Sequence, residues 1–223
     1  LLVWKPDFTF VCVPTPMMQE GDINTTILDE VMKTLDQVTG IIVIKSTVTP
    51  NVIDKYNVVY NPEFLTEKSA CEDFTNAQFH IIGGDPAESL ALEKLYEDYS
   101  LCNPCPMYKM TKAEASFVKY GINCFLATKV TFFNQLYDTC NSHGANFNKV
   151  VRAIGADKRV GVSHTKVPGF DGKQGYGGAC FPKDTAALFN FDADLSLIGK
   201  AIDINNKYRT KYELDDRERT KRE

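Results

Sequence analysis

The feature that most constrains the fold of this 223-residue chain is an alternation of short apolar runs with amphipathic segments over its first hundred residues. Four apolar runs, at residues 9–13, 41–44, 58–60 and 79–82, are too short for helices and predict buried strands. Residues 26–38 and 87–99 carry apolar side chains at helical spacing. Strands that alternate with helices predict βαβ units, and therefore an α/β fold with a mostly parallel sheet.

The second half of the chain lacks such strands and predicts an all-helical domain. Apolar spacing over residues 111–143 predicts one long helix or two in tandem, and residues 146–154 predict a short helix capped by Asn146. The glycine-rich residues 167–178 predict a loop, and two further helices are expected at 182–191 and 195–208. We therefore expect an α/β domain at 1–105 and a helical domain at 106–223.

Composition and charge exclude several classes of partner. The net charge is −4, with 25 Lys and Arg against 29 Asp and Glu, and no basic stripe appears, which argues against nucleic acid. No apolar run approaches the length that spans a bilayer, so we expect no membrane partner. Because the chain starts without Met, we expect its first residue to be internal to a longer parent sequence.

The seven cysteines are odd in number and irregularly spaced, which favours reduced thiols in the cytoplasm over a disulfide framework. Cys102 and Cys105 form a single C-x-x-C. The histidines supply no second ligand pair at matching spacing, so no metal site is expected. A redox role for this pair remains open.

Polar motifs follow the first three predicted strands directly. They are Val13-Pro14-Thr15-Pro16, Lys45-Ser46-Thr47-Val48 and Asn61-Pro62-Glu63-Phe64-Leu65-Thr66-Glu67. Ligands of open parallel sheets bind at the carboxyl ends of the strands, so neighbouring strands would bring the three motifs to one edge. Each motif also has a structural interpretation, as a rigid turn, a cap or a turn initiator. Their shared position favours a binding site.

Two further features carry chemistry in the helical half. Lys119 and Asn123 are four residues apart and share a helix face, although Lys119 could equally extend along an apolar surface. The segment Gly175-Tyr176-Gly177-Gly178-Ala179-Cys180-Phe181-Pro182-Lys183-Asp184 places Cys180 just before a predicted helix. The helix dipole and a nearby lysine would lower the thiol pKa and favour a nucleophilic thiolate, whereas the alternative is an inert buried cysteine.

In this order, the three strand-end motifs, Lys-x-x-x-Asn and the Gly-Tyr-Gly-Gly-Ala-Cys-Phe-Pro-Lys-Asp segment resemble the UDP-glucose/GDP-mannose dehydrogenase family over residues 8–208. The resemblance implies a Rossmann-like NAD-binding domain followed by a helical domain that mediates dimerisation. It also implies that NAD oxidises a nucleotide sugar at C6 to a carboxylate in two steps, through a thiohemiacetal and a thioester on Cys180. The Cys-Phe-Pro-Lys-Asp run favours UDP-glucose, with GDP-mannose or a UDP-N-acetyl sugar as alternatives.

The resemblance also implies roles for individual residues. The catalytic set would be Cys180, Lys119, Asn123, Asp184, Glu63 and Thr47. Residues that contact NAD would be Val13, Pro14, Thr15, Pro16, Ser46, Glu67 and Lys183. Residues that contact the sugar nucleotide would be Glu63, Phe64, Leu65, Lys119, Asn123, Arg159, Gly175, Tyr176 and Gly177. Because Arg159 matches an arginine that reaches the neighbouring subunit's substrate, a homodimer is implied.

The sequence departs from the family pattern in two ways. It contains no Gly-x-Gly-x-x-Gly loop to hold the NAD pyrophosphate, and it stops before the family's third, nucleotide-binding domain. We therefore expect an incomplete NAD-binding domain, weak binding of NAD and little turnover. The competing hypothesis is a catalytically impaired fragment that keeps the dimerisation core.

Overall fold

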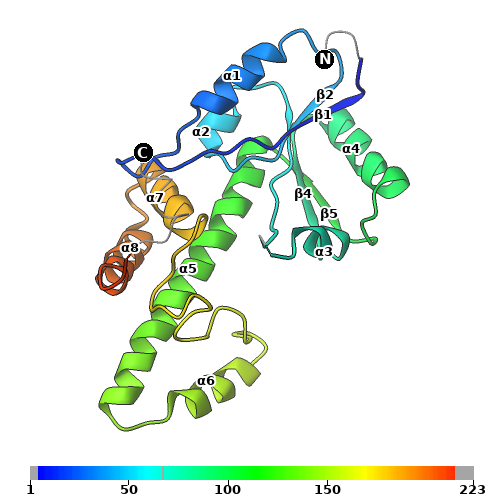
Figure 1. Cartoon of the computed structure of the whole chain (residues 1–223). Helices are drawn as coiled ribbons and strands as arrows, with labels where there is room; N and C mark the ends of the chain where they lie inside the picture. Colours follow the sequence, from blue (N-terminus) through cyan, green and yellow to red (C-terminus); the bar gives the residue numbers. More distant parts are fainter. Residues whose placement is uncertain (1–4, 67, 214–223) are drawn as a thin grey trace. The chain divides into compact units, whose positions relative to one another are not determined.

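The computed structural model describes residues 5–66 and 68–213. It divides into two compact units, the first made of Leu1–Pro16 and Ile23–Tyr120 and the second of Met17–Asp22 and Gly121–Glu223. Figure 1 shows the elements of both units along the chain. The domain boundary expected after residue 105 stays a prediction.

The first unit contains a five-stranded sheet in which the strands follow their order in the sequence. The strands are β1 (Phe8–Val11), β2 (Ile41–Ile44), β3 (Val59–Tyr60), β4 (His80–Gly83) and β5 (Met107–Met110). β1, β2 and β3 run parallel, as do β4 and β5, whereas β3 and β4 are antiparallel. The predicted mostly parallel sheet is confirmed. β5 was not predicted, because its four residues show no continuous apolar run.

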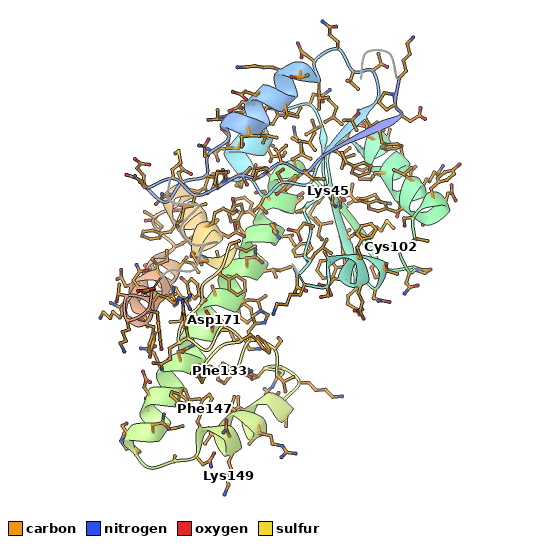
Figure 2. The ribbon with its side chains drawn as sticks, viewed as in Figure 1. Lys45, Cys102, Phe133, Phe147, Lys149 and Asp171 are labelled. Carbon is orange, nitrogen blue, oxygen red and sulfur yellow. The ribbon has the colours of Figure 1, made fainter. Side chains whose placement is uncertain are left out.

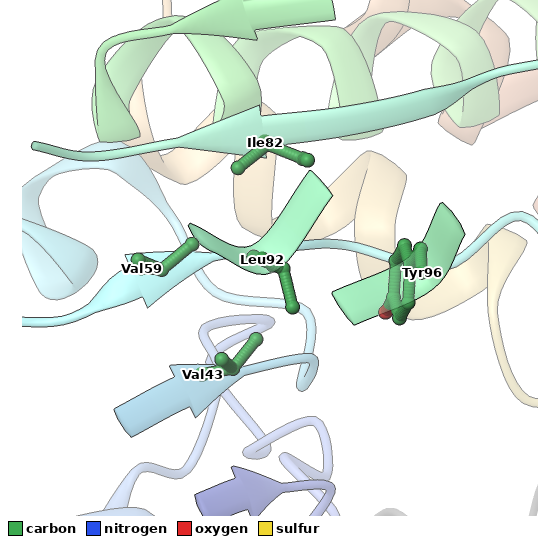
Figure 3. Close-up of a cluster of buried hydrophobic side chains, with 5 residues drawn as sticks. All are labelled: Val43, Val59, Ile82, Leu92 and Tyr96. Carbon is green, nitrogen blue, oxygen red and sulfur yellow. The ribbon is translucent and has the colours of Figure 1, made fainter. Parts of the chain in front are cut away.

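Helices cover the sheet in the first unit. They are α1 (Thr26–Thr34), α2 (Pro50–Ile53), α3 (Ala70–Thr75) and α4 (Pro86–Tyr99). Val43, Val59 and Ile82 of the sheet pack against Leu92 and Tyr96 of α4, and all five are at most 5% exposed (Figure 3). Burial of each such side chain contributes about 1.5–3 kcal/mol.

Both faces of β2 are buried. Val43 and Ile44 point to opposite faces of the sheet, and each is completely buried. The beginning of α5 (Lys112–Ser142) packs closely on β4, since a Cβ added at Gly83 would lie 2.8 Å from the Cβ of Ala115. The burial of Val43 and Ile44 on opposite faces explains why β2 is a continuous apolar run with no alternation of polar residues.

The second unit is helical and contains most of α5, together with α6 (Phe147–Ala156), α7 (Phe181–Phe191) and α8 (Ser196–Arg209). Residues 112–142 form one helix and not two in tandem. Phe133 and Cys140 of α5 pack with Phe147 and Val167 in the core. Figure 2 labels Phe133 and Phe147 of this cluster. Asn146 caps α6, as predicted, by accepting a hydrogen bond from the Lys149 N–H.

The close approach of α7 and α8 depends on a glycine. A Cβ added at Gly199 of α8 would lie 2.7 Å from the ring of Phe189, so only a residue without a side chain lets the helices meet there. The long segment between α6 and α7 contains the predicted glycine-rich loop. None of the helices in the described part of the chain is both long and apolar enough to cross a membrane.

Candidate functional site

The loops that follow β1 and β2 are tied together by two hydroxyl groups. Thr15 Oγ1 donates to the carbonyl of Thr47 at 2.8 Å, and Ser46 Oγ donates to the carbonyl of Val13 at 2.6 Å. Both side chains are buried. The first two strand-end motifs therefore lie side by side at the carboxyl edge of the parallel strands, where the sequence placed them.

The third motif is anchored to the second by Lys45 and Asn61. Lys45 Nζ donates to Asn61 Oδ1 at 2.7 Å and to its carbonyl at 3.1 Å, while Asn61 Nδ2 donates to the Ile81 carbonyl at 2.7 Å. Tyr96 donates to the same Asn61 Oδ1 at 2.6 Å. Burial lowers the pKa of Lys45 to about 8, although nearby acidic groups oppose the shift. The sequence analysis assigned no role to Lys45 or Asn61. The position of the polar Asn61 directly after an apolar strand could have indicated a buried hydrogen-bonding residue there.

Lys119 and Glu63 come together within the first unit. The Lys119 ammonium donates to the Glu63 carbonyl and lies 3.4 Å from Glu63 Oε1 and 5.1 Å from the centre of the Phe64 ring. Lys119 is only 4% exposed. A buried ammonium is stable only with such partners, so these contacts account for the charge of Lys119 in the interior.

A pocket of about 440 Å³ opens beside this pair. Glu63, Phe64 and Leu65 line it together with Lys45, and aromatic rings from α3 and the start of β4 complete its wall. Glu63 Oε2 accepts a hydrogen bond from the Leu65 N–H at 2.6 Å, which fixes the loop at the mouth of the pocket. Glu67, expected at the end of this motif, lies outside the described residues.

Asp184 is the centre of the polar contacts in the second unit. Its side chain is 1% exposed; Asn123 Nδ2 donates to Oδ2 at 2.5 Å, and the Lys183 ammonium pairs with Oδ1. Cys124 Sγ lies 3.7 Å from the Asp184 carbonyl, and burial, reinforced by the Asp184 charge, raises the pKa of Cys124 to about 12. Asn123 and Asp184 therefore meet, and Lys183, expected at NAD, is paired with a carboxylate.

Cys180 lies at the N-cap of α7 and is exposed. The helix begins here because Pro182 suits its first turn, and the Asp184 N–H donates to the Cys180 carbonyl at 2.8 Å. Cys180 and Asp184 are thus one turn apart on the same side of α7. The placement of the thiol at a helix N-terminus agrees with the sequence prediction, and its activation stays a prediction.

Arg159, the residue expected to contact a neighbouring subunit's substrate, lies on the surface of the second unit. Its side chain is 89% exposed, and its guanidinium pairs with the carboxylate of Asp157 at 2.6 Å. Its expected contact with the substrate of a neighbouring subunit stays a prediction.

Cys102 of the C-x-x-C pair contacts neighbouring residues of the first unit. Cys102 Sγ donates to the Phe74 carbonyl at 2.7 Å and lies 3.1 Å from His80 Nε2. Burial raises the pKa of the Cys102 and Cys105 thiols, which disfavours the reactive thiolates. Within residues 5–66 and 68–213, no cluster of three His, Cys, Asp or Glu side chains could hold a metal ion.

A mostly parallel sheet followed by a helical unit is the architecture of solved nucleotide-sugar dehydrogenases. A UDP-glucose dehydrogenase from Pyrobaculum islandicum superimposes with a TM-score of 0.78 and 31% identity, over 91% of this chain and 50% of that one. The fold is shared with a UDP-D-ManNAc dehydrogenase from Pyrococcus horikoshii at a TM-score of 0.79 and 23% identity, over 91% of this chain and 50% of that one.

The sequence comparisons agree. Residues 3–100 match the NAD binding domain of the UDP-glucose/GDP-mannose dehydrogenase family, and residues 113–207 match its central domain. The UDP-glucose 6-dehydrogenase TuaD of Bacillus subtilis is 33% identical over 91% of this chain and 47% of its own length. The chain belongs to the UDP-glucose/GDP-mannose dehydrogenase family. It spans about half the length of these curated relatives.

Proposed function

We propose that this chain carries the chemical residues of an NAD-dependent nucleotide-sugar 6-dehydrogenase that oxidises UDP-glucose to UDP-glucuronate. The observation that carries the proposal is the exposed Cys180 at the start of α7, one turn from a buried Asp184 that Asn123 and Lys183 hold. A thiol beside a positioned carboxylate suits capture of an aldehyde and hydrolysis of a thioester.

The oxidation removes two hydrides from C6, consumes one water and releases three protons. When bound, NAD accepts the hydride that leaves C6 in each oxidation. Cys180 Sγ adds to the aldehyde carbon, and the resulting thiohemiacetal loses hydride and a proton to become a thioester. Water then adds to the thioester carbon, the C–S bond breaks, and the carboxylate and thiol are released. Asp184 takes the proton from this water. For Thr47 and Glu63, the roles of holding the water and assisting proton transfer at the thioester are carried over from the family resemblance alone.

Lys119 and Asn123 stabilise the negative oxygen that develops at C6. An ammonium has three N–H donors and a side-chain amide has two, so each keeps a further donor beyond its bonds to Glu63 and Asp184. The residues fit part of an NAD site, since the loops after β1 and β2 meet at the carboxyl edge of parallel strands. Val13, Pro14, Thr15, Pro16 and Ser46 would hold the cofactor there.

The alkylation rate of Cys180 by iodoacetamide tests the proposal without NAD. An activated Cys180 should react well below pH 8, and faster than the exposed Cys12 and Cys71 of the same chain. Cys180→Ser should remove the fast phase. A Cys180 rate no greater than that of Cys12 and Cys71 would favour the catalytically impaired fragment instead.

Substrate identity is tested by NADH formation with UDP-glucose, GDP-mannose and a UDP-N-acetyl sugar. Because the sequence has no Gly-x-Gly-x-x-Gly loop, the assay uses both the chain itself and a form extended at the amino end by this segment of a relative. We expect turnover of UDP-glucose only by the extended form. Micromolar affinity of the chain itself for NAD in calorimetry would contradict this reasoning.

We also propose that the protein is a homodimer that associates through α5. Phe125 and Phe132, seven residues apart on one face of this helix, are 66% and 56% exposed. A second copy would bury these rings, and Arg159 would then be available to the partner's substrate. Light scattering after size exclusion should give twice the chain mass, and Phe132→Ser should lower it. A monomeric mass for the unaltered chain would refute the proposal.

A further inference from the structure

Two helices of the second unit hold the segment before Cys180 with pairs of polar residues spaced one turn apart. α5 contributes Asn134 and Asp138, and α8 contributes Asn205 and Arg209. Asn134 and Asn205 are 1% and 4% exposed. Polar side chains that are this deeply buried need hydrogen bonds. Asn205 finds its partners in the loop at residues 171–176, whereas Asn134 accepts from this loop and donates to the Val130 carbonyl of α5 at 2.8 Å.

Asn205 pairs with the backbone of Tyr176 in both directions. Its Oδ1 accepts from the Tyr176 N–H at 2.7 Å, and its Nδ2 donates to the Tyr176 carbonyl at 3.0 Å. From the other side, Asn134 Oδ1 accepts from the Gly175 N–H at 3.0 Å. Two consecutive residues of the glycine loop are therefore bound through their main chain, in a way that does not depend on the Tyr176 ring.

The contact is close enough to require glycine at position 175. A Cβ added there would lie 2.5 Å from Asn205 Oδ1, and the φ of Gly175 is +76°. Both the steric limit and the left-handed backbone exclude other residues. Gly175 thus adapts the loop to Asn205.

The segment further upstream is fixed by charged groups. Arg209 Nη1 pairs with Asp171 Oδ2 at 2.7 Å (Figure 2 labels Asp171), and Gln174 Nε2 donates to Asp138 Oδ1 at 2.9 Å. Burial opposes the charge of Asp171, but hydrogen bonds from Arg209 and the Lys173 N–H outweigh it and lower the pKa of Asp171. Tyr208 OH donates to Asp138 Oδ2 at 2.6 Å and so links α8 to α5.

We propose that Asn205 is a positioning residue, which holds the backbone of Tyr176 and thereby the Cys180 thiol in its reactive arrangement. The proposal rests on the nucleophilic role of Cys180 proposed above. Residues 177–180 join Tyr176 to the first turn of α7, and two of the four are glycine, so without an anchor they could adopt many conformations. Fixing both ends orders the thiol before substrate binds.

The test compares Asn205→Asp with Asn206→Asp in the full chain. Asn205→Asp keeps the acceptor for the Tyr176 N–H but sets a carboxylate oxygen against the Tyr176 carbonyl. Asn206 is the next residue of α8 and is exposed, so its substitution makes the same charge change without touching the loop. The readout is the alkylation rate of each cysteine by iodoacetamide, measured by peptide mass spectrometry.

We expect Asn205→Asp to lower the rate at Cys180 at least fivefold and Asn206→Asp to leave it within twofold. Cys12 and Cys71 should keep their rates, and Cys124 and Cys140, which are buried, should stay protected. Protection of these two buried thiols separates repositioning of Cys180 from unfolding. A Cys180 rate within twofold of the unaltered chain in Asn205→Asp would overturn the positioning role.

If Cys124 and Cys140 become reactive in Asn205→Asp, that variant has partly unfolded, and Asn134→Ser is measured instead. This substitution removes the hydrogen bond that Asn134 of α5 accepts from the Gly175 N–H, and its Cys180 rate is judged by the same fivefold and twofold limits. Failure of the two proposals gives different results. A slow Cys180 in the unaltered chain rejects its role as nucleophile, and the positioning role with it. A fast Cys180 that is insensitive to both Asn substitutions rejects the positioning role alone.

Discussion

Removal of the Lys183 ammonium should destabilise the second unit strongly. Asp184 is 1% exposed, and its two carboxylate oxygens are held by Lys183 and Asn123. Lys183→Met keeps the length and apolar stem of the side chain but leaves the carboxylate with Asn123 alone. Loss of one partner of a buried ion pair costs about 3–5 kcal/mol, because the remaining charge is buried without compensation.

The size of this effect can be measured by thermal unfolding followed by helical circular dichroism. In a chain of this size 1 kcal/mol corresponds to about 2–4 °C, so Lys183→Met should lower Tm by roughly 10 °C. Asp184→Asn in the same chain removes the unpaired charge. The double variant Lys183→Met/Asp184→Asn should therefore be more stable than Lys183→Met.

This result would also separate two roles of Lys183. A residue that only contacts NAD would change the affinity for the cofactor without affecting Tm in its absence. If Lys183→Met shifts Tm by less than about 2 °C, the ion pair does not support Asp184, and the reasoning about the second unit is wrong.

Three further predictions concern stability. Between pH 7 and 9.5 the unfolded state binds more protons at Lys45 than the folded state, whose Lys45 pKa is about 8, so stability should rise with pH. Urea unfolding should show the unaltered chain gaining about 2 kcal/mol relative to Lys45→Met over this window, and parallel pH profiles would exclude the shift. Asn146→Ala should cost about 1 kcal/mol, because α6 loses its cap; an unchanged urea midpoint would contradict this. Gly175→Ala should lower Tm by several degrees and slow Cys180 alkylation, whereas Gly161→Ala, where a Cβ meets nothing within 4 Å and φ is also positive, controls for backbone strain alone; equal effects of the two would contradict the close contact.

Much of the fold follows from local patterns. The runs at β1, β2, β3 and β4 were found because buried parallel strands are continuously apolar, and α4, α6, α7 and α8 were found within one or two residues of their ends. β5 escaped detection because its burial comes from pairing with β4, which is a tertiary contact. The antiparallel pairing of β3 with β4 could not be predicted from the sequence either, because an apolar run of two to four residues does not indicate the direction of the strand it forms.

The sequence by itself determined the family resemblance, because the motifs Lys-Ser-Thr-Val, Asn-Pro-Glu-Phe-Leu and Gly-Gly-Ala-Cys-Phe-Pro-Lys-Asp follow one another in order along the chain, and the chemical roles of their residues stay predictions. Only the tertiary structure decided the partners of those residues. It pairs Asn123 with Asp184, 61 residues later, sets Asn61 between Lys45 and Tyr96, and places Asn205 against a loop 29 residues earlier. A hydrogen bond between residues distant in the chain depends on how helices and strands pack, and no local spacing encodes that packing.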